Sequence, residues 1–338
     1  MRSKLFRILV TGGAGFIGSE FVRQAVAAGF KVAVVDALTY AGDVERLKEA
    51  KAKFDFIKAD VTDGKKMAAV FKKFKPSAVV HFAAETHVDR SIQNAVDSLR
   101  TNVMGTQTMI ELARTFGTER FVHISTDEVY GEIETGHFYE TTPLNPSSPY
   151  SAAKAAADFL IKSYARTYQF PAIIVRPSNN YGPWQYPEKF VPVVIYKALN
   201  DQKIPVYGNG LNVREWLYVS DCASAILAVL KKGKTGETYN IGSGQERTNI
   251  LVVETLLDIL KKPKSLIEFV KDRPGHDLRY ALNSDKIRRE LKWMPVVQFN
   301  DGMKKTVEHY QKNRKWLERK VSFLKTYWKK VYKKQPRT

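Results

Sequence analysis

Short apolar runs rich in β-branched residues alternate with longer helix-like segments through the first half of the chain. The runs cover residues 5–11, 31–37, 54–60, 78–84, 120–126 and 171–177. Because they are apolar at nearly every position and not only at every second one, we predict parallel strands buried on both faces. With helical segments between them, these strands indicate an α/β fold built on a doubly wound parallel sheet.

The pattern loosens after about residue 180. Four prolines between residues 183 and 205, with Gly208 and Gly210, divide the next segment into pieces typical of a substrate-binding lobe. Residues 217–230 and 237–243 again have the pattern of a helix and a strand. We therefore expect a nucleotide-binding domain at 1–180, to which segments around 215–245 return. Residues 181–316 are expected to form mainly a smaller, discontinuous C-terminal substrate-binding lobe.

Residues 317–338 combine an apolar stripe with a cluster of positive charge. The stripe recurs at steps of four and three, which places it on one helix face; it consists of Leu317, Val321, Leu324, Trp328 and Val331. From residue 304 onward there are thirteen Lys or Arg and two Glu, so more than half of the net charge of +19 lies there. We expect a basic amphipathic tail packed on its own subunit, with contact to an anionic membrane surface as the alternative. A nucleic-acid partner is not expected, because no recognised binding module is present.

The composition fits a soluble globular protein. With 338 residues, 44% hydrophobic and 26% charged, the chain can bury a sizeable core. No uninterrupted run of about 18 apolar residues occurs, so we expect no membrane-spanning helix. The single cysteine, Cys222, excludes an intrachain disulfide and fits a reducing compartment, for which the cytoplasm is the default expectation.

A glycine-rich turn lies between the first predicted strand and the helix after it. Residues 11–18 are Thr-Gly-Gly-Ala-Gly-Phe-Ile-Gly, whose glycines let a pyrophosphate approach the helix N-terminus. Asp36 ends the second strand, where a carboxylate accepts hydrogen bonds from a ribose and repels a 2′-phosphate. The pattern predicts a Rossmann-type dinucleotide site that prefers NAD to NADP. Asp60 and Val61, after the third strand, are candidates for the adenine side, although an ordinary turn aspartate explains Asp60 equally well.

Two further motifs carry acid–base chemistry. In Tyr150-Ser-Ala-Ala-Lys154 the spacing places both end residues on one helix face, where the ammonium favours the phenolate and makes Tyr150 a usable base. Thr126-Asp127-Glu128 follows the fifth strand and adds adjacent carboxyls, whose pKa values separate in a closed site because like charges repel. A simple dehydrogenase needs no such pair. The combination indicates removal of a proton and of water around a temporary oxidation.

Taken in order, these motifs resemble the extended short-chain dehydrogenase/reductases and, within them, the nucleotide-sugar 4,6-dehydratases. The resemblance runs from about Arg7 to about Trp316. Its further blocks are His-Phe-Ala-Ala-Glu-Thr-His-Val-Asp-Arg-Ser at 81–91, Ser-Thr-Asp-Glu-Val-Tyr-Gly at 125–131, Asn-Asn-Tyr-Gly-Pro at 179–183, Pro-Glu-Lys at 187–189, Arg-Glu-Trp-Leu-Tyr-Val at 214–219 and Arg-Pro-Gly-His-Asp-Leu-Arg-Tyr at 273–280. Sister epimerases and decarboxylases usually lack the Asp-Glu pair. We therefore expect a dehydratase, with an epimerase, a decarboxylase or a non-enzymatic NAD-binding protein as alternatives.

The resemblance implies a reaction on a nucleotide-diphosphate sugar. Tyr150 takes the proton of the 4-hydroxyl while hydride passes from C4 to NAD, Glu128 removes the C5 proton, and Asp127 protonates the departing 6-hydroxyl before hydride returns to C6. Thr126 hydrogen-bonds the oxygen at C4, and Lys154 also holds the nicotinamide ribose. The resemblance further implies dTDP-glucose as the substrate, with UDP-glucose as the alternative, and a homodimer. No metal is expected, because His81, His87 and His123 fall within or just after predicted strands and show no metal-ligand spacing.

The resemblance also implies two sets of binding residues. The cofactor set is Gly12, Gly15, Phe16, Ile17, Gly18, Asp36, Leu38, Thr39, Asp60, Val61, Phe82, Ala83, Ala84, Glu85, Thr101, Tyr150, Lys154 and Asn180. The substrate set is Thr86, Thr126, Asn179, Lys189, Phe190, Pro205, Tyr207, Arg214, Asn249, Arg273 and His276. Arginine suits a diphosphate because its planar fork donates two hydrogen bonds at once.

Overall fold

The computed structural model describes residues 7–50, 53–272 and 275–331. Within them a seven-stranded sheet runs in the order β10-β6-β5-β4-β1-β2-β3. Every neighbouring pair in it is parallel, as the near-continuous apolar runs predict. Its strands are β1 (Arg7–Thr11), β2 (Lys31–Asp36), β3 (Phe54–Lys58), β4 (Ala78–His81), β5 (Arg120–Ile124), β6 (Ala172–Pro177) and β10 (Thr238–Ile241).

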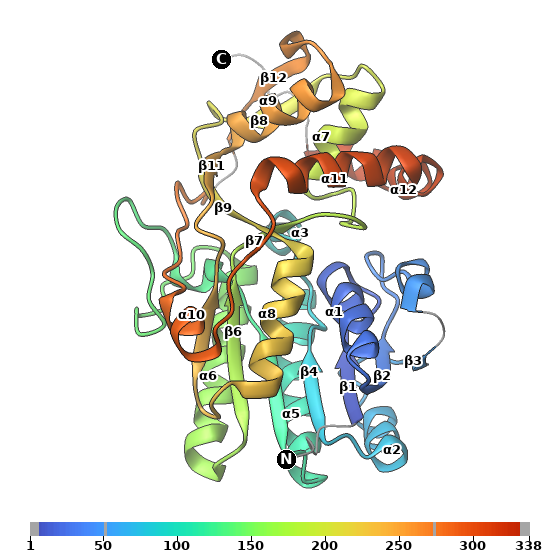
Figure 1. The fold of residues 1–338 in the computed structure, drawn as a ribbon, viewed down its shortest axis with the longest axis vertical. Coiled ribbons are helices and arrows are strands. Elements are labelled where there is room, and N and C mark those ends of the chain that lie inside the picture. Colours follow the sequence, from blue (N-terminus) through green and yellow to red (C-terminus); the bar gives the residue numbers. More distant parts are fainter. Residues whose placement is uncertain (1–6, 51–52, 273–274, 332–338) are drawn as a thin grey trace.

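Helices cover both faces of this sheet (Figure 1). Successive side chains of a strand point to opposite faces, so Ile8 and Val10 join one core while Leu9 joins another. The first core includes α1 (Phe16–Ala27) and α8 (Val219–Lys232). The second includes α2 (Gly64–Phe74), α5 (Thr106–Thr115) and α6 (Pro149–Tyr168). The chain therefore has the doubly wound α/β architecture predicted from its sequence.

Shorter helical elements lie in the connections between the main strands and helices of both parts of the fold. They are η1 (Val44–Ala50), α3 (Val88–Gln93), α4 (Ala95–Ser98), η2 (Leu99–Gly105), η3 (Asp127–Tyr130), η4 (Lys264–Leu266) and α10 (Asp285–Leu291). Of these, η3 begins directly after β5 and contains both adjacent carboxyls. Thr126 caps it: the Thr126 side chain accepts a hydrogen bond from the backbone N–H of Glu128. The two carboxyls are thereby fixed at the carboxyl end of a central strand.

A second lobe lies beyond the carboxyl ends of the main strands (Figure 1). It holds a small sheet in the order β11-β9-β7 and a pair β12-β8. The strands are β7 (Asn179–Tyr181), β8 (Ile204–Tyr207), β9 (Val213–Tyr218), β11 (Glu246–Thr248) and β12 (Ile267–Val270), and the helices are α7 (Phe190–Leu199), α9 (Asn249–Leu260), α11 (Phe299–Lys312) and α12 (Arg314–Val331). These helices share one apolar core. The chain reaches this lobe, returns to the main sheet through α8 and β10, and leaves again, so the lobe is discontinuous.

The C-terminal helix α12 is part of this second core. Leu317, Val321 and Leu324 are almost completely buried, and Trp328 is 8% exposed. The fifth residue of the stripe, Val331, has a side chain outside the described set. Packing on the same chain is thus confirmed for the described stripe, and the apolar face that a membrane-surface helix would insert is already covered. Among the described residues, every helix is too short or too polar to cross a bilayer.

Candidate active site

A cavity of about 300 Å³ opens where the main sheet meets the second lobe. Its walls come from the loops that follow β1, β2, β3, β4, β5 and β6. All six strands are parallel, so their carboxyl ends meet at one edge of the sheet, which is where ligands bind in folds of this kind. Segments far apart in the sequence therefore share one site.

The glycine turn provides a backbone-lined approach to this cavity. Gly12 has φ +67°, and a Cβ there would lie 2.6 Å from the backbone N of Ala83. A Cβ on Gly18 would lie 2.3 Å from the Gly12 carbonyl oxygen, so the turn closes only around glycine. Gly15 precedes α1 without any side-chain cap, which leaves the N–H groups of the first helical turn to a ligand. This cradle fits the pyrophosphate of a dinucleotide.

Asp36 stands beside the glycine turn at the end of β2. Its Oδ2 accepts from the backbone N–H of Ala14 at 2.9 Å, and its Oδ1 accepts from that of Leu38 at 2.8 Å. Burial raises the pKa of this carboxyl, while these two hydrogen bonds and the Arg46 guanidinium act in the opposite direction. Asp36 lines the cavity, where the sequence predicted a ribose partner.

The structure brings the predicted cofactor residues together with one exception. Leu38 does not line the cavity; it has φ +53° and packs against the core beside α1. The others line it: Gly12, Gly15, Phe16, Ile17, Gly18, Asp36, Thr39, Asp60, Val61, Phe82, Ala83, Ala84, Glu85, Thr101, Tyr150, Lys154 and Asn180.

The five candidate catalytic residues also line this cavity. Thr126, Asp127 and Glu128 come from the start of η3, and Tyr150 and Lys154 come from α6. The Thr126 hydroxyl donates to Asp127 Oδ1 at 3.1 Å, and the Thr126 side chain also acts to lower the pKa of Tyr150. Thr126 therefore influences both the carboxyl pair and the phenol.

Asp127 lies in an environment that favours its neutral form. Burial is the main cause, and the negative charges of Glu128 and Glu215 add to it, so that the pKa of Asp127 rises to about 8. Its Oδ2 is buried and has no hydrogen-bond partner among the described residues. Near neutral pH the group is thus a protonated acid in the cavity wall, as the adjacent-carboxyl argument predicts for one member of the pair.

The expected action of Lys154 on Tyr150 is not what this geometry shows. The Lys154 ammonium donates to the Ile124 carbonyl oxygen at 2.6 Å and lies 3.3 Å from His123 Nε2, so it is directed at the end of β5. Burial, followed by the charge of Glu128, raises the pKa of Tyr150, and burial lowers that of Lys154 to about 8. The helix spacing places both side chains in the cavity, but the Ile124 carbonyl binds the ammonium.

A buried polar network lies behind Lys154. His123 Nε2 is 3.7 Å from Asp158, whose carboxylate accepts a hydrogen bond from Nε of Arg176 at 2.9 Å and forms an ion pair with its Nη2 at the same distance. Arg176 also donates to the Tyr130 hydroxyl at 2.7 Å. His81, also buried, bonds the hydroxyls of Thr11 and Thr106. Within the described residues no group of three or more His, Cys, Asp or Glu side chains is placed to hold a metal ion.

The predicted substrate residues fall into two groups. Thr86, Thr126, Asn179 and Lys189 line the cavity, and the Lys189 ammonium donates to the Thr86 carbonyl oxygen at 2.6 Å. The other described members lie in the second lobe outside the cavity lining, and Arg273 falls outside the described residues. The members outside the lining are Phe190, Pro205, Tyr207, Arg214, Asn249 and His276.

Two of these lobe residues are held by neighbours in the same lobe. Arg214 is buried and donates to the carbonyl oxygens of Val213, Leu278 and Asp277 at 2.7, 3.2 and 2.8 Å. His276 Nδ1 lies 2.6 Å from Asp272 Oδ1. Backbone carbonyls and a carboxylate thus hold these two side chains outside the cavity lining.

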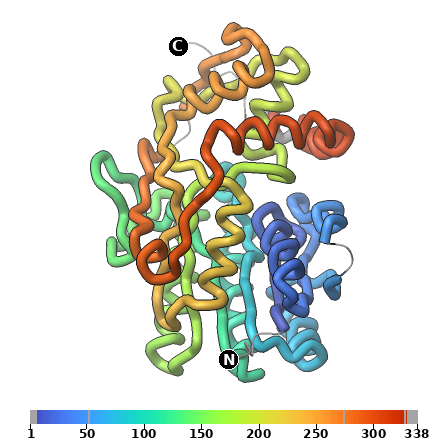
Figure 2. Tube along the Cα trace, in the orientation of Figure 1, coloured from blue at the N-terminus to red at the C-terminus, as the bar shows by residue number. Residues whose placement is uncertain are grey.

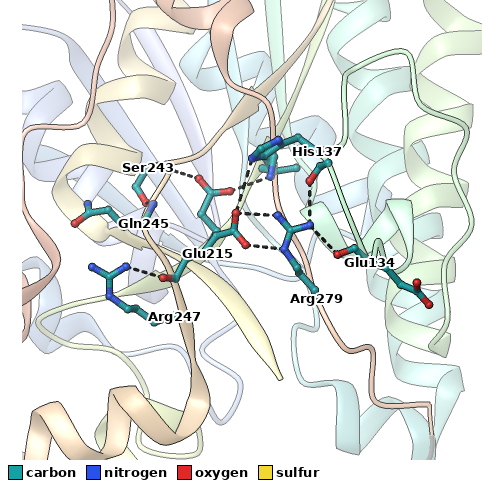
Figure 3. A network of polar contacts seen from close by, with 11 residues as sticks. Glu134, His137, Glu215, Ser243, Gln245, Arg247 and Arg279 are labelled. Atoms are coloured by element: carbon teal, nitrogen blue, oxygen red, sulfur yellow. Dashed lines mark hydrogen bonds and ion pairs between the residues drawn. The ribbon is translucent and has the colours of Figure 1, made fainter. Parts of the chain in front are cut away.

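A polar network joins the loop after η3 to the second lobe (Figure 3). Arg279 binds the Glu246 carboxylate at 2.7 and 2.9 Å and donates to the Gly136 carbonyl oxygen at 2.9 Å. Glu215, also labelled there, accepts from the backbone N–H groups of Gly244 and Leu282 at 2.6 and 2.9 Å. These bonds fix the buried Glu215 carboxyl, whose charge acts on Asp127.

The cavity has further lining residues that sequence reasoning missed. Ser178 and Gln185 each carry a buried oxygen without a hydrogen-bond partner among the described residues. Glu188 is buried and pairs with Arg90 at 3.1 Å. Its position in the Pro-Glu-Lys block at 187–189 is the sequence signal that could have identified it as a lining residue. Arg46 is completely buried, yet it lies in a segment with charged neighbours that is typical of a solvent-exposed helix, so nothing in the sequence singles it out.

The sequence is similar to that of a known enzyme family along most of its length. The sequence profile of the family described as GDP-mannose 4,6 dehydratase matches residues 9–306. A dTDP-glucose 4,6-dehydratase of Xanthomonas campestris pv. campestris (strain B100) is 46% identical over 331 residues, covering 92% of this chain and 94% of that protein. The chain belongs to the dTDP-glucose 4,6-dehydratase family. The protein is therefore an enzyme of this family, and its doubly wound α/β fold is the fold of the family.

Solved structures of enzymes that catalyse different reactions share the fold of this chain. DesIV, a dTDP-glucose 4,6-dehydratase from Streptomyces venezuelae, crystallised with NAD and TYD bound, matches with a TM-score of 0.90 at 46% identity, covering 93% of this chain and 99% of that one. A UDP-glucose 4-epimerase from Thermus thermophilus in complex with NAD matches at 0.86 and 32% identity, covering 90% and 99%. Both share the fold, so a dehydratase must be distinguished from an epimerase by site residues.

Proposed function

We propose that this enzyme converts dTDP-glucose to the 4-keto-6-deoxy sugar, with NAD as its resident cofactor. The observation that carries the proposal is Asp127: a buried acid with a pKa of about 8, beside a second carboxyl and within one cavity with Tyr150. An alcohol oxidation alone uses only a base. A neutral acid next to a carboxylate is what loss of water requires.

The residues around the glycine turn fit NAD. Gly12, Gly15 and Gly18 would hold the pyrophosphate, Asp36 the adenosine ribose, and Asp60 with Val61 the adenine. When bound, NAD supplies an acceptor for the hydrogen of C4 and later a donor for C6. Because nothing is oxidised or reduced overall, the cofactor has no need to leave between turnovers.

Tyr150 is the proposed base for the sugar 4-hydroxyl. Burial raises the pKa of its phenol, so the group needs a neighbouring positive charge in order to lose its proton and act as a phenolate base. Lys154 is the cation on the same helix face, and the Thr126 side chain also acts to lower the pKa of the phenol. We propose that Lys154 leaves the Ile124 carbonyl to support Tyr150 and to hold a ribose hydroxyl.

Glu128 and Asp127 divide the elimination between them. Glu128 takes the C5 proton, which the 4-ketone makes acidic, and Asp127 gives its proton to the departing 6-hydroxyl. The pKa of Asp127 keeps that proton in place near neutral pH. Water therefore leaves as a neutral molecule, and no charged oxygen forms in the buried site.

The second lobe is proposed to hold the nucleotide end of the substrate. Residues 1–180 would bind NAD, residues 181–316 mainly the substrate, and residues 317–338 form the basic tail. Lys189, which lines the cavity, would bind the diphosphate together with Arg214 and His276 of the lobe. Pro205 and Tyr207 on β8 and Asn249 at the start of α9 would contact the base. UDP-glucose is the competing substrate, because a thymine methyl is a small feature to discriminate.

A panel of nucleotide sugars tests this function. The enzyme is incubated with dTDP-, UDP-, CDP- and GDP-glucose, and products are separated by ion-pair chromatography with mass detection. We expect loss of water from dTDP-glucose, giving a product lighter by one water molecule. Formation of dTDP-galactose would instead select an epimerase, and faster turnover of UDP-glucose would transfer the assignment to that substrate.

A homodimer is proposed on the strength of one exposed apolar face. Large apolar side chains on α3, α4, η2 and α6 face solvent, although these elements contact one another. They are Ile92, Val96, Leu99, Met104 and Phe159, which are 44, 65, 49, 57 and 57% exposed. Apolar side chains grouped in this way mark interaction surfaces. We also propose the cytoplasm as the compartment, because the one cysteine, Cys222, is buried and unbridged.

A further inference from the structure

Side chains of the C-terminal helix α12, whose backbone is drawn in red in Figure 2, bond to the segment after β2, which lies in the blue part of the trace. This segment, residues 41–46, runs into the first turn of η1 and is called the 41–46 loop here; its members Ala41, Gly42 and Arg46 line the cavity. Trp316 Nε1 and Lys320 Nζ of α12 each lie 2.8 Å from the same atom of the loop, Asp43 Oδ2. Both are N–H donors, so the carboxylate accepts two hydrogen bonds from one helix.

The 41–46 loop is bonded in turn to the glycine turn. The backbone N–H of Asp43 and Nη1 of Arg46 each donate to the Ala14 carbonyl oxygen at 3.0 Å. Ala14 lies between the second and third glycines of the turn, and its own N–H is held by Asp36. The loop therefore fixes both the backbone that faces the pyrophosphate and the carboxylate that faces the ribose.

The contacts between α12 and the loop are largely shielded from water. The side chain of Asp43 is 10% exposed and that of Lys320 is 17% exposed. The buried Arg46 guanidinium lies over the Trp316 ring, 5.6 Å from its centroid. A shielded ion pair acts more strongly than an exposed one, because solvent screens it less. The helix itself is anchored by the apolar side chains of Leu317 and Val321, so it does not depend on this ion pair to stay in place.

We propose that Trp316 and Lys320 are positioning residues for the dinucleotide: acting through Asp43, they hold the 41–46 loop and the glycine turn in the geometry that retains NAD between turnovers. The inference rests on the proposed function, because only a reaction that returns the cofactor to its starting form gains from never releasing it. It assigns a function to α12 (Arg314–Val331), which lies beyond residue 306, where the match to the family profile ends.

Substitution of Lys320 tests the inference with a matched control on the same helix. Lys320→Met removes the charge and keeps the aliphatic stem; Lys325→Met does the same at an exposed lysine of α12. NAD retained after dialysis is measured on the folded proteins, and the Kd for NAD by calorimetry after the nucleotide is stripped. We expect Lys320→Met to raise the Kd about five-fold. Lys325→Met should match the unaltered protein, and Lys320→Arg should restore binding.

A second variant makes the result independent of Lys320 itself. Asp43→Asn keeps an oxygen to accept from the Glu45 N–H, which Asp43 Oδ1 binds at 2.9 Å, but removes the negative charge. It should weaken NAD binding in the same direction as Lys320→Met. Unchanged NAD affinity in both variants, or equal loss in Lys320→Met and Lys325→Met, would overturn the inference. Failure of dTDP-glucose dehydration alone would overturn the proposed function and leave these NAD measurements standing.

Discussion

Thr126 donates its hydroxyl hydrogen to Asp127 Oδ1 at 3.1 Å, and the other oxygen of that carboxyl is buried without a partner among the described residues. One oxygen of the acid is thus held by its neighbour in the sequence, and the residue as a whole lines the cavity.

The division of labour between the two motifs predicts a separable defect. Asp127→Asn combined with Glu128→Gln should preserve oxidation at C4, seen as transient NADH absorbance, because Tyr150 and Lys154 remain. Dehydration should fall by at least about a hundred-fold, the scale of a lost acid–base group. Loss of both steps in a folded variant that still binds NAD would show that the roles are divided wrongly.

The pKa of Asp127 predicts the basic limb of the pH profile. The acid must carry its proton, so turnover should be sustained below about pH 8 and fall about ten-fold per unit above it. Lys154 also has a pKa of about 8, which makes the assignment ambiguous in the unaltered enzyme. The half-reaction of C4 oxidation in Asp127→Asn distinguishes the two groups. If its rate still changes near pH 8, the basic limb belongs to Lys154; if its rate does not change there, the limb belongs to Asp127.

Burial of Asp127 also predicts an effect on stability. Its pKa in the folded chain is raised from 3.8 to about 8, so between these values the native state holds a proton that the unfolded chain releases. Its contribution to stability is complete below about pH 4 and is lost as the pH rises through about 8. Asp127→Asn should raise the Tm at pH 8 and change it little at pH 4. A Tm difference that does not vary with pH would contradict this.

The ion pair of Asp158 and Arg176 predicts a large loss of stability when one partner is removed. Both side chains are completely buried. Asp158→Asn leaves the Arg176 guanidinium unpaired in the core and should lower the free energy of unfolding by about 3–5 kcal/mol. Urea denaturation followed by circular dichroism measures it. As a control, Asp285→Asn, at an exposed position, should lie within about 0.5 kcal/mol of the unaltered protein.

The exposed apolar face predicts the oligomeric state. Val96→Glu places a charge on this face, at a side chain that is 65% exposed, and should convert a dimer to a monomer, measured by sedimentation velocity at several concentrations. Phe323→Glu is the matched control: Phe323 is 73% exposed but lies on α12, away from this face. A single-subunit mass for the unaltered protein, or dissociation by both substitutions alike, would argue against the proposed interface.

Much of the fold could be predicted because the signals are local. The parallel strands follow from apolar runs such as 31–37, since only a strand buried on both faces avoids polar residues almost throughout. The cofactor site follows from the glycines of residues 11–18, because a side chain at position 12 or 18 would collide with backbone. The stripe of α12 likewise determined which helix face is buried.

Other features depend on contacts between distant residues, which no local pattern records. The sequence places Tyr150 and Lys154 on one helix face, but the Ile124 carbonyl decides where the ammonium points. It shows that two carboxyls are adjacent, yet the burial that raises the pKa of Asp127 comes from the packed structure. The bond between Lys320 and Asp43 joins residues 277 positions apart, and only the folded chain brings such groups within hydrogen-bond distance.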